Sequence, residues 1–262
     1  MSNTSPSQPP ARDPMPVSET AAEVVRTFLS LLAYLPRLAL VPFTATFLTQ
    51  GALLLFAAPA MPGGADQPPQ LGLPHLLGAV VVAAAYVMFL VDWHRLVLLG
   101  PGPETTRPRL RFARRDLRYF GYGLLVGLLS ALASLPAFIL VAPFSGALGG
   151  PLPALLIGVL LAVTAMIALG IVLPAAAVDK RLGIPDAFDA TKRVLAKLLA
   201  LAIIILLPLQ IIVVFFTLIS QMLAHSLGFV IPLLFIALAV EYTTAAIFAT
   251  LLSVVYRRRI GM

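Results

Sequence analysis

The chain of 262 residues contains no cysteine and few charged residues. Without a thiol, a disulfide framework, a thiolate metal site and a cysteine nucleophile are all excluded. Charged residues make up 11% of the chain, against about 25% in soluble proteins. Such a composition excludes a long soluble domain.

Hydrophobic residues take the place of the missing charge and make up 60% of the chain. They are gathered into runs near the ~20 residues that a helix needs to cross a hydrocarbon layer of ~30 Å. Helices are favoured because a backbone surrounded by lipid must satisfy its own hydrogen bonds. We therefore expect an all-α membrane protein with six transmembrane helices arranged as three hairpins. The predicted spans are residues 38–58, 73–92, 117–142, 152–178, 194–223 and 229–256.

The first residues differ from the rest of the chain. The sequence MSNTSPSQPPARDPMPV is rich in proline and small polar residues, and such a composition buries too little apolar surface to offset its ordering entropy. Residues 1–17 are therefore predicted to form a disordered cytoplasmic tail, and residues 18–262 the six-span domain. A cleaved signal peptide is not favoured, because the apolar stretch begins far behind the short basic region that such peptides show.

The basic residues are distributed asymmetrically among the connections. All 18 Lys and Arg residues precede span one, follow span six, or lie at the boundaries between spans two and three or four and five. The connections near residues 60–72, 143–151 and 224–228 contain none. By the positive-inside rule, both termini are predicted to be cytoplasmic. The same asymmetry accounts for the net charge of +7 without a nucleic-acid partner.

Two segments ahead of spans one and five have an amphipathic pattern. In the first, Thr20 and Glu23 have the spacing of a capping box, and Val24 and Phe28 begin an apolar face. In the second, Pro185 can open a short helix. Both segments are predicted to be interfacial helices on the cytoplasmic surface.

Glu241 is the most informative single residue of the predicted spans. It precedes Arg257 by about 16 residues, which places it near mid-bilayer at ~1.5 Å per residue. A carboxylate at that depth is a functional hypothesis by default. Polar side chains at a similar depth complete a candidate intramembrane polar layer: Gln50, Ser130, Ser134, Thr164 and Gln210.

This layer has two interpretations. It could bind a small solute or relay a proton. It could also hold helices together by hydrogen bonds worth about 0.6–2 kcal/mol per contact. The second interpretation is favoured, because one acid without a second intramembrane charge is weak evidence for a transport pathway.

The exit of span two, VDWHRL, places an acid, an indole, an imidazole and a guanidinium side by side. Span two is predicted to end near Asp92, so Asp92 is expected to pair with Arg95 or Arg37 at the same depth. Trp93 would then belong to the interfacial aromatic belt, beside His94. The cluster therefore predicts a membrane boundary rather than a catalytic centre.

The connection after span two is strongly basic. Anionic lipid headgroups are its expected partners, at about 1 kcal/mol per cation. The candidate lipid contacts are Arg107, Arg109, Arg111, Arg114, Arg115 and Arg118.

Small residues recur at four-residue spacing in spans three and four and predict close helix packing, either between these spans or in a dimer. They are Gly123, Gly127 and Ala131 in span three, and Ala154, Gly158 and Ala162 in span four.

No catalytic motif is present. The histidines His75 and His225 are predicted on the outer side and His94 on the inner side, so they cannot share a metal ion. A Ser–His–acid set and a glycine-rich phosphate loop are also absent from the sequence. We therefore expect no cofactor, no metal and no enzymatic activity.

The stretches VDWHRLVLLG and VLPAAAVDKRLGIPDAFDATKRVLAKLLALA carry a resemblance. They resemble a family of uncharacterised six-span bacterial inner-membrane proteins, similar to the membrane domain that some glycerophosphodiester phosphodiesterases carry beside their catalytic domain. The resemblance implies a multi-pass protein of the bacterial inner membrane. It does not imply the phosphodiesterase activity, because these residues do not include that catalytic domain.

Two functions are compatible with these observations. The first is a non-enzymatic scaffold that organises lipids, a membrane-protein partner or a second copy of itself. The alternative is a small-solute or proton-coupled transporter that uses the layer around Glu241. A dry, packed environment of Glu241 would exclude the transporter.

Overall fold

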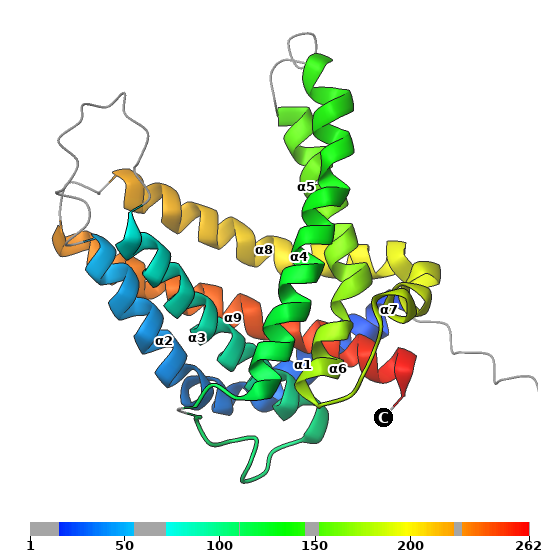
Figure 1. Cartoon of the computed structure of the whole chain (residues 1–262), viewed down its shortest axis with the longest axis horizontal. Helices are drawn as coiled ribbons and strands as arrows, with labels where there is room; N and C mark the ends of the chain where they lie inside the picture. Colours follow the sequence, from blue (N-terminus) through cyan, green and yellow to red (C-terminus); the bar gives the residue numbers. More distant parts are fainter. Residues whose placement is uncertain (1–15, 55–71, 110, 145–151, 223–226, 262) are drawn as a thin grey trace, which may run out of the picture.

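The computed structural model describes residues 16–54, 72–109, 111–144, 152–222 and 227–261 (Figure 1). Regular secondary structure over these ranges is entirely helical. Residues 1–15 of the predicted tail lie outside the described residues, and the first helix begins at Val17, the last residue assigned to that tail.

Among the described residues, six helical segments are long and apolar enough to cross a membrane, which agrees with the predicted number of spans and confirms the all-α class. They are Val17–Ala52, Leu73–Leu99, Arg114–Val141, Leu152–Ala177, Ile184–Phe216 and Gly228–Ile260.

The helices within these segments are α1 (Val17–Leu31), α2 (Leu35–Ala52), α3 (Leu73–Leu99), α4 (Arg114–Val141), α5 (Leu152–Gly170), α6 (Val172–Ala177), α7 (Ile184–Thr191), α8 (Leu195–Met222) and α9 (Leu227–Ile260). Short 3₁₀ turns join α1 to α2 at Leu32–Tyr34 and α7 to α8 at Lys192–Val194. A third turn, Ala142–Phe144, follows α4.

The end of α3 differs from the prediction. The helix does not stop near Asp92 but continues to Leu99, where Gly100 ends it with φ of 78° and donates its N–H to the Leu96 carbonyl. That left-handed conformation favours glycine, which has no Cβ to clash with the backbone. The extension carries Asp92, Trp93 and His94 into a part of α3 that is buried against other helices.

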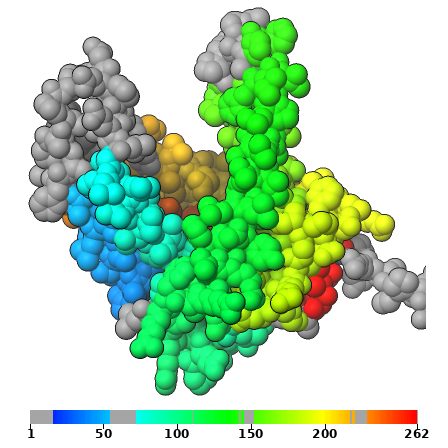
Figure 2. Space-filling model, viewed as in Figure 1, coloured from blue at the N-terminus to red at the C-terminus, as the bar shows by residue number. Residues whose placement is uncertain are grey.

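Helix α9 lies against α1, α2, α3, α6 and α8, whereas α4 and α5 pack chiefly on each other. Figure 1 shows the α4–α5 pair leaving the other helices at a steep angle. The surface is hollowed between this pair and α3, with α8 behind (Figure 2). The molecule is thus open on this face.

The two stripes of small residues lie in different environments. In α5, a Cβ added at Gly158 would meet the Phe138 ring of α4 at 2.9 Å, and Ala154 is buried, so this stripe packs on α4. In α4, a Cβ added at Gly123 or Gly127 would meet nothing within 4 Å. Only the α5 stripe therefore serves the contact between these two helices.

Candidate functional site

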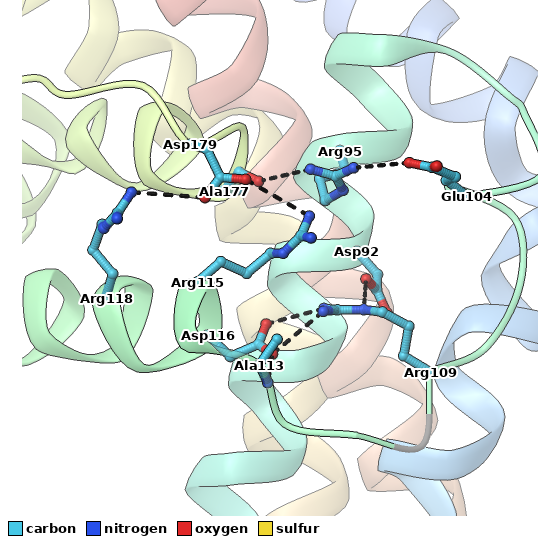
Figure 3. A network of polar contacts seen from close by, with 10 residues as sticks. All are labelled: Asp92, Arg95, Glu104, Arg109, Ala113, Arg115, Asp116, Arg118, Ala177 and Asp179. Carbon is cyan, nitrogen blue, oxygen red and sulfur yellow. Dashed lines mark hydrogen bonds and ion pairs between the residues drawn. The ribbon is translucent and has the colours of Figure 1, made fainter.

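Arg109 lies at the centre of a buried ionic network formed where α3, α4 and the connection between them meet (Figure 3). Its Nε is 2.5 Å from Oδ1 of Asp92 on α3. Its Nη2 and Nη1 lie 3.0 Å and 3.3 Å from the two carboxylate oxygens of Asp116, in the first turn of α4. One guanidinium thus ties the connection to two helices.

Asp116 has a second role at the start of α4. Its carboxylate accepts the Ala113 N–H at 2.6 Å, and the Asp116 N–H donates in turn to the Ala113 carbonyl at 2.9 Å. This exchange satisfies donors that a helix start leaves unpaired, and an acid in the first turn suits the helix dipole. Local sequence therefore positions the carboxylate that Arg109 binds.

The charges of this network are coupled. Burial lowers the pKa of Arg109, but the nearby carboxylates of Asp92 and Asp116 raise it by more, so the net shift is upward. The guanidinium therefore stays charged at every physiological pH. Asp116 is fully buried and Asp92 nearly so, and both depend on this cation for compensation.

The predicted partners of Asp92 were wrong. Arg95 lies 3.9 Å from Glu104 and donates to the Ala177 carbonyl at 3.4 Å, and Arg37 is exposed. The reason is tertiary: α3 continues past Asp92, and the connection folds back to bring Arg109 onto it. Asp92 and Arg95 do form ionic contacts, but with Arg109 and Glu104 rather than with each other.

Trp93 and His94 are fully buried, so the prediction that Trp93 belongs to an aromatic belt was also wrong. The Trp93 indole donates to Oγ1 of Thr250 at 2.9 Å. The His94 ring bridges Ser253 on α9 at 2.7 Å and Tyr119 on α4 at 3.1 Å. These contacts join three helices through polar groups. Thr250 and Ser253 lie three residues apart on one face of α9. This spacing of two hydroxyl residues could have indicated a polar contact with another span.

The arginines of the connection divide into three groups. Arg109 belongs to the buried network, so its assignment as a lipid contact was wrong. Arg115 and Arg118 lie 3.8 Å and 3.6 Å from Asp179, which ends α6 in the left-handed conformation with φ of 59°. Arg107, Arg111 and Arg114 are exposed and form no ion pair with a described residue.

The structure does not bring the residues of the candidate polar layer into contact through hydrogen bonds. The hydroxyls of Ser130, Ser134 and Thr164 each donate to a carbonyl of their own helix. Gln50 is half-buried and Gln210 is exposed. Within the described part of the chain, no hydrogen bond joins two members of this layer.

Glu241 is exposed rather than packed. It lies near the buried Tyr86 hydroxyl of α3, and that hydroxyl meets the geometry of a hydrogen bond with no described residue. Three turns further along α9, on the same face, Leu252 packs against Gly170 of α5. Glu241 therefore faces the side on which α5 leaves α9.

Among the residues that the structure describes, no group of three or more His, Asp or Glu side chains is arranged to hold a metal ion. His225 lies outside the described residues.

Comparison with protein-family models, with curated proteins and with solved structures finds no match for this chain. Its class therefore follows from the fold itself. Six apolar helices of membrane-spanning length define a multi-pass membrane protein.

Proposed function

We propose that the chain is a non-enzymatic protein of the bacterial cytoplasmic membrane that organises anionic lipids, and through them a membrane-protein partner, at its cytoplasmic face. In this proposal, both termini are cytoplasmic, the spans form three hairpins, and α1 and α7 lie along the membrane surface. The observation that carries the proposal is the exposed set Arg107, Arg111 and Arg114 beside the anchored Arg109.

The anchoring of the connection strengthens lipid binding. A free basic segment would lose conformational entropy on binding a headgroup, at roughly 1–2 kcal/mol per ordered residue. Here Arg109 is held by two carboxylates, and Thr105 closes a turn by donating to the Gly100 carbonyl at 2.7 Å and accepting the Gly102 N–H at 2.8 Å. Arg107 therefore lies between two anchored residues, Thr105 and Arg109, and Arg114 is held in the first turn of α4.

Further support comes from charge and sequence. All 18 Lys and Arg residues lie on one side of the six-span arrangement, as expected for the cytoplasmic side of a bacterial membrane protein. The resemblance to bacterial inner-membrane proteins agrees with this location.

The test compares two variants of equal charge in nanodiscs. Replacing Arg107, Arg111 and Arg114 by Gln should weaken retention of phosphatidylglycerol by on the order of 100-fold, since three cations contribute about 1 kcal/mol each. The control replaces the exposed Arg26, Arg37 and Arg181 by Gln. Retention is measured by native mass spectrometry. Equal retention by both variants would contradict the proposal.

A second function is favoured by the exposure of Glu241. An intramembrane carboxylate that faces an open side of the molecule can exchange protons or bind a cation, which a packed layer could not do. We propose proton-coupled transport as the alternative.

The alternative is tested by proton flux into proteoliposomes that contain a pH-sensitive dye. Glu241→Gln should abolish flux, whereas the exposed Glu104→Gln should leave it unchanged. Absence of flux through the wild-type protein would remove this alternative without affecting the lipid proposal.

A further inference from the structure

An apolar pocket of about 360 Å³ lies beneath α1, where this helix meets α8 and α9. Every residue that lines it is apolar: Ala21, Val24, Val25, Phe28, Ile204, Ile205, Pro208, Leu209 and Ile247. A polar solute would lose its hydration there without gaining hydrogen bonds from side chains, so the walls select hydrocarbon.

The pocket is a product of how α1 rests on α8. Val24 and Phe28 are buried, and Val24 packs in the same core cluster as Leu198 and Leu201 of α8. One turn beyond this contact, the side chains of α1 no longer fill the space above Ile204 and Pro208. The remaining volume is in the range of small-ligand sites, whereas a further helix, about 10 Å across, needs more room.

Two cations lie near the start of the segment that lines the pocket. Lys197 precedes Ile204 by two turns of α8, so these two residues share one face of that helix. Arg193 lies in the 3₁₀ turn Lys192–Val194 directly before α8. Both cations are exposed and form no ion pair with any residue that the structure describes. The neighbouring acid, Asp189, is 2.5 Å from Lys192 instead.

The spacing between cation and pocket matches a phospholipid. Two helical turns separate Lys197 from Ile204 by about 10 Å along the axis. A headgroup region is about 5–7 Å thick, and the flexible stem of a lysine covers the remaining distance. A phosphate at Lys197 thus places the start of an acyl chain at the pocket.

We propose that this pocket binds one acyl chain of an anionic phospholipid whose phosphate is held by Lys197 and Arg193. The site is separate from the arginines at 107–114 and stands whether or not those residues bind lipid. It gives the protein one tightly held lipid wedged between α1 and α8.

The experiment titrates the full-length protein in mild detergent with phosphatidylglycerol or with phosphatidylcholine of the same chains, and counts bound lipids by native mass spectrometry. Val25→Trp fills the pocket and should weaken the first bound lipid at least 10-fold for both headgroups. Ala22→Trp, on the exposed face of α1 outside the pocket lining, should bind as the wild type does.

The headgroup is tested separately. In a protein whose Arg107, Arg111 and Arg114 are already Gln, replacing Lys197 and Arg193 by Gln should abolish the preference for phosphatidylglycerol while binding of phosphatidylcholine remains. Replacing the exposed Arg26 and Arg181 by Gln is the charge-matched control and should keep the preference.

Four results would overturn the proposal. The first is unchanged binding by Val25→Trp. The second is loss of binding by Val25→Ala, which leaves the pocket open and should retain the lipid. The third is a headgroup preference that survives loss of both Lys197 and Arg193. A co-purifying peptide in place of lipid would assign the pocket to a protein partner and would also overturn it.

Discussion

Arg109 is the residue whose loss should cost the most stability. Arg109→Gln removes the cation that lies between Asp92 and Asp116, so two buried carboxylates lose the cation that both of them bind. Breaking a buried ionic arrangement in this way costs about 3–5 kcal/mol. We expect the variant to unfold at markedly lower temperature or denaturant concentration in detergent.

The control for this prediction is Arg111→Gln, because Arg111 is exposed and lies two residues away. Its free energy of unfolding should stay within ~0.5 kcal/mol of the wild type. The free energy of unfolding of Asp92→Asn should lie between those of the two variants, since Arg109 then keeps both hydrogen bonds to Asp116. Equal stability of Arg109→Gln and Arg111→Gln would show that the network is not structural.

The sequence predicted the contacts of individual side chains less well than it predicted the helices. It placed Asp92 and Arg95 among charged neighbours, but spacing rules along one helix could not find Arg109, which is 17 positions away in sequence. That contact depends on a turn closed by Gly100, Gly102 and Thr105. The environment of Glu241 was equally inaccessible, because it depends on where α5 leaves α9.

The glycines of α4 and α5 allow a test at the scale of a helix pair. In Gly158→Ala, the new methyl group would meet the Phe138 ring at 2.9 Å, so the ring or the helix must move. Overpacking of this kind costs about 1–3 kcal/mol. Gly127→Ala is the matched control, because a Cβ there meets nothing within 4 Å. It should be neutral or stabilise the helix by up to ~1 kcal/mol.

Thermal unfolding of both variants in the same detergent measures the difference. If Gly158→Ala proved as stable as Gly127→Ala, the close approach of α5 to Phe138 would not hold in the protein. Gly127→Ala should be less stable than the wild type only if a second molecule covers that face of α4.

Helices as elements were predictable, and their ends were not. Apolar runs near 20 residues identify spans because the hydrocarbon thickness sets the length. The end of α3 at Leu99 could not be read in this way, since Trp93 and His94 are polar enough to mark a boundary but are buried by hydrogen bonds to Thr250 and Ser253. Polar partners on another helix thus extended the span beyond its apolar run.

At the scale of the whole molecule, the described ion pairs follow the asymmetry of basic residues. Glu23 of α1 binds Arg257 and Arg258 at the end of α9, which joins the first helix to the last. The network of Arg109 joins α3 to α4, and Asp179 binds Arg115 and Arg118 between α6 and α4. These pairs connect segments that are all predicted on the cytoplasmic side, so one orientation of the molecule in the membrane accounts for them together.

The absence of cysteine makes this orientation directly testable, because any introduced thiol is unique. Glu104→Cys places a thiol on the connection between α3 and α4, where the native side chain is 89% exposed. Gly72→Cys places one at an exposed position just before α3, at the opposite end of that helix. In intact spheroplasts, a membrane-impermeant maleimide should label position 72 and not position 104.

Inverted membrane vesicles should reverse this pattern, and solubilised protein, with both thiols accessible, should label at both positions. Labelling of position 104 in spheroplasts would place the exposed arginines outside the cell. The basic connections would then lie outside the cell, against the positive-inside rule. The proposal of cytoplasmic lipid organisation would fail, whereas the pocket beneath α1 would keep its apolar walls and its cations, and only the leaflet that supplies its lipid would change.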